Sequence, residues 1–271
     1  MKKLMILMCS IISISFAGCI NDSGCDNCTF ATGTAKTNIT NKIALICSLT
    51  KVNPKAYGGW DGACPGTDID AKNFAELCAK NNIPYIKLEN SQCTNQHIKD
   101  MWKKCISKLD TKDGLFIFFY SGHGGQVYSS TEKDGLDETL CFWDGEMVDD
   151  TVWKLLNSVP KTCRIFMVTD CCNSGSNFQL PYNLERSKKK LKIFSRSGEP
   201  NMVHFGGCND GESSYGSNYG GTFTLNLKKY YNPSLTYKQW FDKVLSVMKN
   251  SQQVPTFAET GKSFKNTKIF K

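Results

Sequence analysis

The sequence contains no hydrophobic run long enough to cross a membrane in the ordinary way. Its N-terminal apolar run, Leu4–Phe16, has 13 residues, whereas a membrane-spanning helix needs about 20. The chain also lacks internal repeats and any basic–aromatic stripe or nucleic-acid motif. We therefore interpret the formal charge of +8 as a solvated surface and expect no nucleic-acid partner. The 271 residues suffice for one domain with a full core.

A recognisable disulfide framework is missing although the chain has 14 cysteines. Cys25 and Cys28 are spaced C-x-x-C but have no second pair, which makes them weak as a zinc site or a redox motif. Other cysteines lie in apolar contexts, and we interpret these as small core residues. They are Cys47, Cys78, Cys105, Cys141 and Cys163.

The N-terminus has the features of a signal peptide over residues 1–18. Two lysines precede the apolar run, and Phe16-Ala17-Gly18-Cys19 resembles a bacterial lipobox with Phe16 where Leu is usual. We expect Cys19 to be the lipidated first residue of an exported protein anchored to the membrane. An ordinary cleaved signal and a soluble secreted protein are the alternative.

Residues 19–41 are polar and rich in small side chains, which predicts a flexible tether before a single domain at 42–271. Within this domain, strand-like and helix-like segments alternate, so we expect an α/β fold with a mainly parallel sheet and helices on both faces. The expected strands are 42–49, 83–88, 115–120, 163–169, 201–205 and 263–270, and the expected helices are 70–81, 94–109, 150–157 and 236–250.

Two apolar segments end in polar, glycine-bearing loops that could supply a nucleophile and a base. FIFFYSGHG at 116–124 contains His123, and MVTDCCNSG at 167–175 contains Cys172, 49 residues later. A thiol needs an adjacent base to become a useful nucleophile at neutral pH. We expect His123 to take the proton of Cys172, and the N–H groups of Gly124 and Cys172 to form an oxyanion hole.

These motifs resemble the caspase-like cysteine peptidases, and most closely the metacaspases. The family has Y-S-G-H-G around its histidine and D-x-C-x-S-G around its cysteine, matching residues 120–124 and 170–175. Asn173 replaces the usual histidine after the nucleophile. The resemblance implies a caspase-like fold, a monomer, and a cysteine endopeptidase that needs no cofactor for its chemistry.

Specificity is predicted from the residues around the dyad. Asp170, two positions before the nucleophile, could pair with a Lys or Arg of a polypeptide substrate. In metacaspases this position reads a basic residue, and Ser121 and Asp70 align with residues lining the same pocket. Cys64 stands where animal caspases have an arginine that binds substrate Asp, which argues against Asp specificity. Helix capping is the alternative role for Asp70.

The acidic segment 134–150 resembles the metacaspase segment that holds calcium. Asp137, Asp149 and Asp150 align with calcium ligands, but Gln179 replaces a further acidic ligand, which should weaken the site. Calcium as an activator and a solvated acidic loop that caps the next helix are both open.

Three further features complete the resemblance. Residues 206–214 and 220–224 match family segments, and in the family the loop at 208–210 lies close to the cleft. Members often cut themselves after Lys or Arg in the region of residues 186–196, whereas a solvated loop is the alternative. The candidate positions are Arg186, Lys190, Lys192 and Arg196.

Two other functions stay open from the sequence. One is an exported caspase-fold lipoprotein that serves as a binding or scaffold module, and the other is an Asp-specific peptidase. The pairing of His123 with Cys172 argues against the first.

Overall fold

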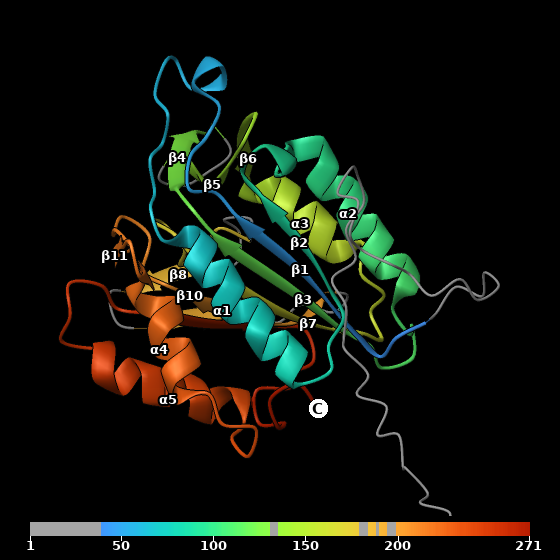
Figure 1. Cartoon of the computed structure of the whole chain (residues 1–271). Helices are drawn as coiled ribbons and strands as arrows, with labels where there is room; N and C mark the ends of the chain where they lie inside the picture. Colours follow the sequence, from blue (N-terminus) through green and yellow to red (C-terminus); the bar gives the residue numbers. More distant parts are fainter. Residues whose placement is uncertain (1–38, 131–134, 179–183, 188–189, 194–198) are drawn as a thin grey trace, which may run out of the picture.

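The computed structural model describes residues 39–130, 135–178, 184–187, 190–193 and 199–271, with the backbone alone for 184–187 and 190–193. Strands and helices alternate along most of the chain (Figure 1). The helices are α1 (Thr67–Lys80), α2 (Asn95–Lys108), α3 (Asp149–Asn157), α4 (Thr222–Tyr230) and α5 (Tyr237–Met248), and single 3₁₀ turns occur at Pro54–Ala56 and Asn90–Gln92.

The central sheet has six strands in the order β13-β10-β7-β3-β1-β2. All neighbouring pairs are parallel except β10 with β13, which confirms the predicted mainly parallel sheet. The strands are β1 (Lys42–Ser48), β2 (Tyr85–Glu89), β3 (Leu115–Ser121), β7 (Arg164–Asp170), β10 (Asn201–Gly206) and β13 (Thr256–Thr260).

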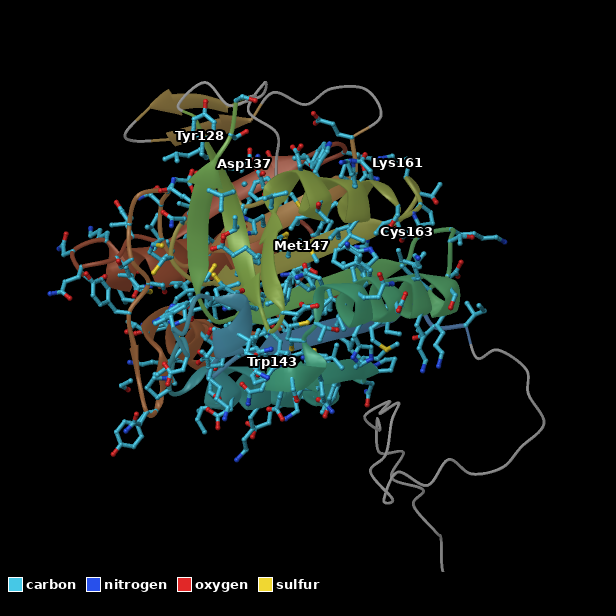
Figure 2. All side chains as sticks on the ribbon, turned by 90° about the horizontal axis from the view of Figure 1, so that it is seen from above. Tyr128, Asp137, Trp143, Met147, Lys161 and Cys163 are labelled. Atoms are coloured by element: carbon cyan, nitrogen blue, oxygen red, sulfur yellow. The ribbon has the colours of Figure 1, made fainter. Side chains whose placement is uncertain are left out.

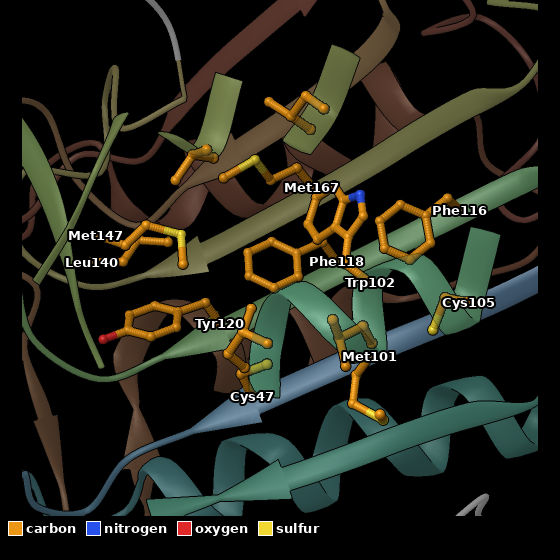
Figure 3. Packing of buried hydrophobic residues seen from close by; sticks show 14 of the residues in the cluster. Cys47, Met101, Trp102, Cys105, Phe116, Phe118, Tyr120, Leu140, Met147 and Met167 are labelled. Atoms are coloured by element: carbon orange, nitrogen blue, oxygen red, sulfur yellow. The ribbon is translucent and has the colours of Figure 1, made fainter. Parts of the chain in front are cut away.

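Helices cover both faces of this sheet, and the sequence of β3 shows why. Its continuous apolar run alternates, so that Phe116, Phe118 and Tyr120 join one buried cluster and the residues between them join the other. The first cluster includes Trp102 of α2, which packs on Phe116 and Phe118 (Figure 3). The second cluster packs α1, α4 and α5 on the opposite face.

Within the described residues, three small sheets lie outside the central one. One consists of β4 (Gly124–Tyr128), β5 (Leu136–Phe142) and β6 (Gly145–Val148) in antiparallel pairing. The others are the hairpins of β8 (Leu184–Ser187) with β9 (Lys190–Ile193) and of β11 (Gly216–Ser217) with β12 (Gly220–Gly221). Within the described ranges, none of the helices has the length and apolar character that crossing a bilayer requires.

The prediction of a last strand at 263–270 is wrong. This segment consists of turns with one isolated bridge from Lys268 to Thr236, and the antiparallel edge strand is β13, earlier in the chain. The apolar residues Phe264, Ile269 and Phe270 are buried because they pack beneath α5, not because they alternate in a sheet.

Candidate active site

The register of the central sheet brings His123 and Cys172 to neighbouring positions. Ser121 of β3 pairs with Asp170 of β7, and each proposed catalytic residue follows its strand end by two positions. The loops touch at Gly124, where the β-carbon of any other residue would lie 2.0 Å from the carbonyl oxygen of Cys172. Glycine at 124 therefore allows the two loops to meet.

The imidazole of His123 is half-buried under the loop that follows β1. Its ring lies against the indole of Trp60, with centroids 4.8 Å apart. Burial lowers the pKa of His123, and hydrogen bonds to the backbone of Ala63 and Gly62 act in the opposite direction. Nε2 is buried and has no hydrogen-bond partner among the described residues. The backbone of this loop thus supplies the orienting contact that the sequence did not reveal.

Hydrogen bonds from Tyr120 and Cys141 fix the backbone at His123. The hydroxyl of Tyr120 donates to the carbonyl of His123 at 2.7 Å and to that of Cys141 at 2.9 Å. The N–H of Cys141 also donates to the carbonyl of His123, at 3.0 Å. Tyr120 points from β3 toward the small sheet (Figure 3), so this sheet anchors the histidine loop.

Cys172 lies in a tight loop between a buried thiol and a left-handed residue. Cys171 is buried, and burial raises its pKa well above the usual range, which leaves Cys172 as the half-exposed thiol of the two. Asn173 has φ of 52°, a conformation that Asn adopts more readily than most residues. Its side chain accepts from the N–H of Gly211 at 2.8 Å, which ties the nucleophile loop to the loop after β10.

Asp170 is buried and fully engaged by hydrogen bonds. Ser214 Oγ donates to one carboxylate oxygen at 2.6 Å, and the N–H and hydroxyl of Thr224 donate to the other at 3.0 and 2.7 Å. Burial raises the pKa of Asp170, while these donors lower it.

Asp70 and Ser121 belong to the same cluster. Asp70 accepts from Ser121 Oγ at 2.8 Å and from the N–H of Gly221 at 2.8 and 3.0 Å, although it lies on the first turn of α1. Its side chain therefore faces the pocket and makes no cap on its own helix. Burial and then the charge of Asp170 raise the pKa of Asp70 to about 8. Burial, and then the nearby Asp170, Cys172 and Asp70, raise the pKa of Cys64 to about 11.

Four residues of the site were not predicted as such. Ser214, Gly221 and Thr224 lie in the two family-like segments at 206–214 and 220–224, so the signal was present but gave no role to individual positions. Trp60 lies outside the matched motifs, and nothing in the sequence indicated its contact with His123.

The acidic segment forms β5 and β6 of the small sheet and the start of α3. Figure 2 shows Asp137 at one end of this sheet and Trp143 at the other. Because Thr139 pairs with Val148, Asp137 lies at the end of the small sheet where α3 begins with Asp149 and Asp150. One oxygen of Asp137 is buried without a hydrogen-bond partner in the described ranges.

Among the described residues, Asp137, Asp149 and Asp150 nevertheless do not form a metal centre. Over the ranges that the structure describes, no three His, Cys, Asp or Glu side chains form a group able to hold a metal ion. Asp149 accepts a hydrogen bond from the N–H of Asp150 at 2.8 Å. Both residues begin α3, where negative carboxylates interact favourably with the helix dipole. Calcium binding stays a prediction.

Several predicted positions lie outside what the structure describes. Cys19, with the signal peptide and most of the tether, precedes residue 39, and Gln179 and Arg196 fall in gaps. Arg186 lies in β8, and Lys190 and Lys192 lie in β9, for which the backbone alone is described.

Comparison with known sequences identifies a family and several relatives of this chain. The family described as Caspase domain (Peptidase_C14) matches residues 41–265. Metacaspase-1 of Schizosaccharomyces pombe is 35% identical over 117 residues, covering 41% of this chain and 26% of that protein. Metacaspase-3 of Arabidopsis thaliana is 27% identical over 183 residues, covering 59% and 50%. The chain thus spans half or less of the length of these relatives.

Two solved structures confirm the predicted fold class. Protein GSU0716 from Geobacter sulfurreducens aligns with a TM-score of 0.69 and 25% identity, covering 84% of this chain and 98% of that one. Caspase-1 from Spodoptera frugiperda aligns with a TM-score of 0.56 and 12% identity, covering 89% and 97%, and at this identity it supports the fold alone.

Proposed function

Because the chain belongs to the caspase domain family, we propose that it is a cysteine endopeptidase that cleaves polypeptides after Arg or Lys. His123 removes the proton of Cys172, the thiolate attacks the scissile carbonyl, and the protonated imidazole then donates to the leaving amine. Water hydrolyses the resulting thioester. Backbone hydrogen bonds of Gly62 and Ala63 orient the imidazole for these transfers, and its Nε2 has no hydrogen-bond partner among the described residues.

The observation that supports the dyad most strongly is the register of β3 and β7. Because Ser121 pairs with Asp170, the loops that follow β3 and β7 start side by side at the same edge of the sheet. Gly124 allows the histidine loop to contact the carbonyl oxygen of Cys172. A binding module would not require a thiol and an imidazole at adjacent strand ends. The N–H groups of Gly124 and Cys172 are the proposed oxyanion donors.

Specificity for a basic residue is supported by the charges next to Cys172. Asp170 and Asp70 are both buried carboxylates of one cluster, and neither forms an ion pair with a described Lys or Arg. A substrate Asp would meet two carboxylates and the uncharged Cys64, which would leave its own charge unpaired. A guanidinium or ammonium group would satisfy the cluster.

An assay with fluorogenic peptides that end in Arg, Lys or Asp tests this proposal, with calcium and with a chelator. We expect turnover of the Arg and Lys peptides, none of the Asp peptide, and a loss of at least about 10³-fold in Cys172→Ala. Cys105→Ala, which removes a core thiol of α2, is the matched control. A protein without turnover under any of these conditions would contradict the enzyme and support a binding module.

The export, anchoring and self-processing of the chain are separate parts of the proposal. We propose a lipid anchor at Cys19, calcium as an activator through Asp137, Asp149 and Asp150, and cleavage within 186–196. Mass spectrometry of the protein before and after calcium would show the added lipid mass and any cut together. A Cys172→Ala sample separates self-cleavage from contaminating proteolysis.

A further inference from the structure

The two carboxylates of the specificity pocket face each other across a glycine. A methyl carbon built on Gly221 would lie 2.3 Å from Asp170 Oδ2 and 2.9 Å from Asp70 Oδ2. Asp70 is 1% exposed and Asp170 is 5% exposed. Two like charges this close in a buried site strongly disfavour double ionisation, and such a pair titrates in two separate steps.

The surroundings of the pair contain donors but no compensating cation among the described residues. Asp170 receives three hydrogen bonds, one of them from the N–H of Thr224 in the first turn of α4, where helix N–H groups are free and favour an anion. Asp70 receives a hydroxyl from Ser121 and the N–H of Gly221. The titratable groups that interact electrostatically with the pair are Asp68 and the thiols of Cys64, Cys171 and Cys208, none of which supplies a positive charge when ionised.

We propose that the pocket without substrate holds one proton, carried by Asp70 while Asp170 is ionised, and that binding of a substrate Arg or Lys expels this proton to solvent. The step balances, because one O–H bond of the Asp70 carboxyl breaks, a proton leaves, and the arriving cation takes its place between two carboxylates. This inference rests on the proposed specificity for basic residues. It adds that the two carboxyl groups have a charge of −1 before binding and −2 after.

The donors explain why the proton resides on Asp70. Asp170 is held by the helix terminus and two hydroxyls, and this favours its charged form. The pKa of Asp70, raised to about 8 by burial and by Asp170, agrees with a carboxyl that is protonated in neutral solution. Ser214 and Thr224 are therefore positioning residues that decide which carboxyl is the anion.

Binding should consequently strengthen with rising pH. While Asp70 is protonated, each unit of pH makes expulsion of the proton about tenfold easier, and the effect levels off above the pKa. A peptide with citrulline in place of arginine has the same shape without the charge. It should bind weakly and release no proton.

Calorimetry of full-length Cys172→Ala with an Arg peptide tests the proton count directly, with buffers of different ionisation enthalpy. We expect release of nearly one proton at pH 7, and a value close to zero with Asp70→Asn added. Asp68→Asn, on the same turn of α1, is the control that should retain the release. Binding of the Arg peptide without release, or release that persists in the Asp70→Asn variant, would overturn the inference.

A second measurement does not need a substrate. Infrared difference spectra of the free protein should show the carbonyl band of a protonated carboxylic acid at pH 7 that Asp70→Asn removes. If this band is absent, the proposal that Asp70 carries a proton is overturned. Its presence in a protein that fails to bind any Arg peptide would instead contradict the proposed specificity, so the two failures are distinct.

Discussion

His204 shows how burial of one residue determines a pH response. Its ring is fully buried in β10, Nε2 is 2.8 Å from Thr169 Oγ1, and it packs on Phe178. Burial lowers the pKa of His204 to about 3. Between that value and its ordinary pKa of about 6.5 the unfolded chain binds the proton and the folded chain does not, so acid favours unfolding.

We therefore expect His204 to reduce the free energy of unfolding by about 1.4 kcal/mol for each pH unit below 6.5. Chemical denaturation at pH 7 and pH 5 measures this. His204→Phe should have a smaller difference between the two pH values than the wild type, whatever its stability at pH 7. His97→Gln, which changes a residue at the start of α2, is the control. Equal differences in the wild type and His204→Phe would contradict the prediction.

At the scale of elements, the segment between β1 and α1 acts on the site as one unit. It places the indole of Trp60 over His123, the backbone of Gly62 and Ala63 at its ring, and Cys64 near the pocket. Tyr57 holds the segment to the core, since its hydroxyl donates to the carbonyl of Phe142 at 2.6 Å.

Removal of the indole should therefore expose the imidazole. In Trp60→Ala we expect the pKa of His123 to rise toward its ordinary value, because burial is the main cause of its depression. The acid limb of the profile of kcat/KM against pH should move to higher pH, with a rate loss of at most about fourfold at pH 6, because an imidazole with the ordinary pKa is then about one-quarter deprotonated. Tyr128→Ala, at an exposed aromatic of β4, is the control. An unshifted limb would show that Trp60 has no influence on His123.

Burial on both faces decided which elements could be predicted from the sequence. The strands β1, β3 and β7 are buried on both faces, and their continuous apolar runs made their existence clear from the sequence. In β13, burial alternates along only five residues, which is a weak sequence signal. The apolar residues at 264–270 were wrongly predicted as a strand because they are core residues that pack from an irregular segment. His123 and Cys172 follow directly from strand ends, whereas Trp60 lies in a distant loop and Thr224 in the first turn of α4, and both reach the site only through the tertiary fold.

The whole molecule protects both edges of its sheet. At one edge, β2 has Lys87 in its centre, ion-paired to Glu89 at 2.9 Å, and a charged edge strand resists pairing with another chain. At the other edge, β9 lies against β13. Neither edge, as far as the structure describes the chain, offers a free apolar strand for dimerisation.

We accordingly expect a monomer, measured by light scattering coupled to size-exclusion chromatography. Replacement of residues 184–193 by a Gly-Ser linker of equal length should uncover β13 and cause self-association. Lys55→Ala, in the exposed turn at 54–56, should stay monomeric. A wild-type dimer would show that the hairpin does not block the edge.

The order of the strands has one more consequence. β7 and β10 are neighbours in the sheet and parallel, and the long connection between them contains the β8–β9 hairpin. An opening of the chain within this connection removes no strand of the central sheet and breaks no rung of the ladder between β7 and β10. Two fragments, one ending beyond Cys172 and one beginning before β10, would therefore each retain complete strands of the central sheet.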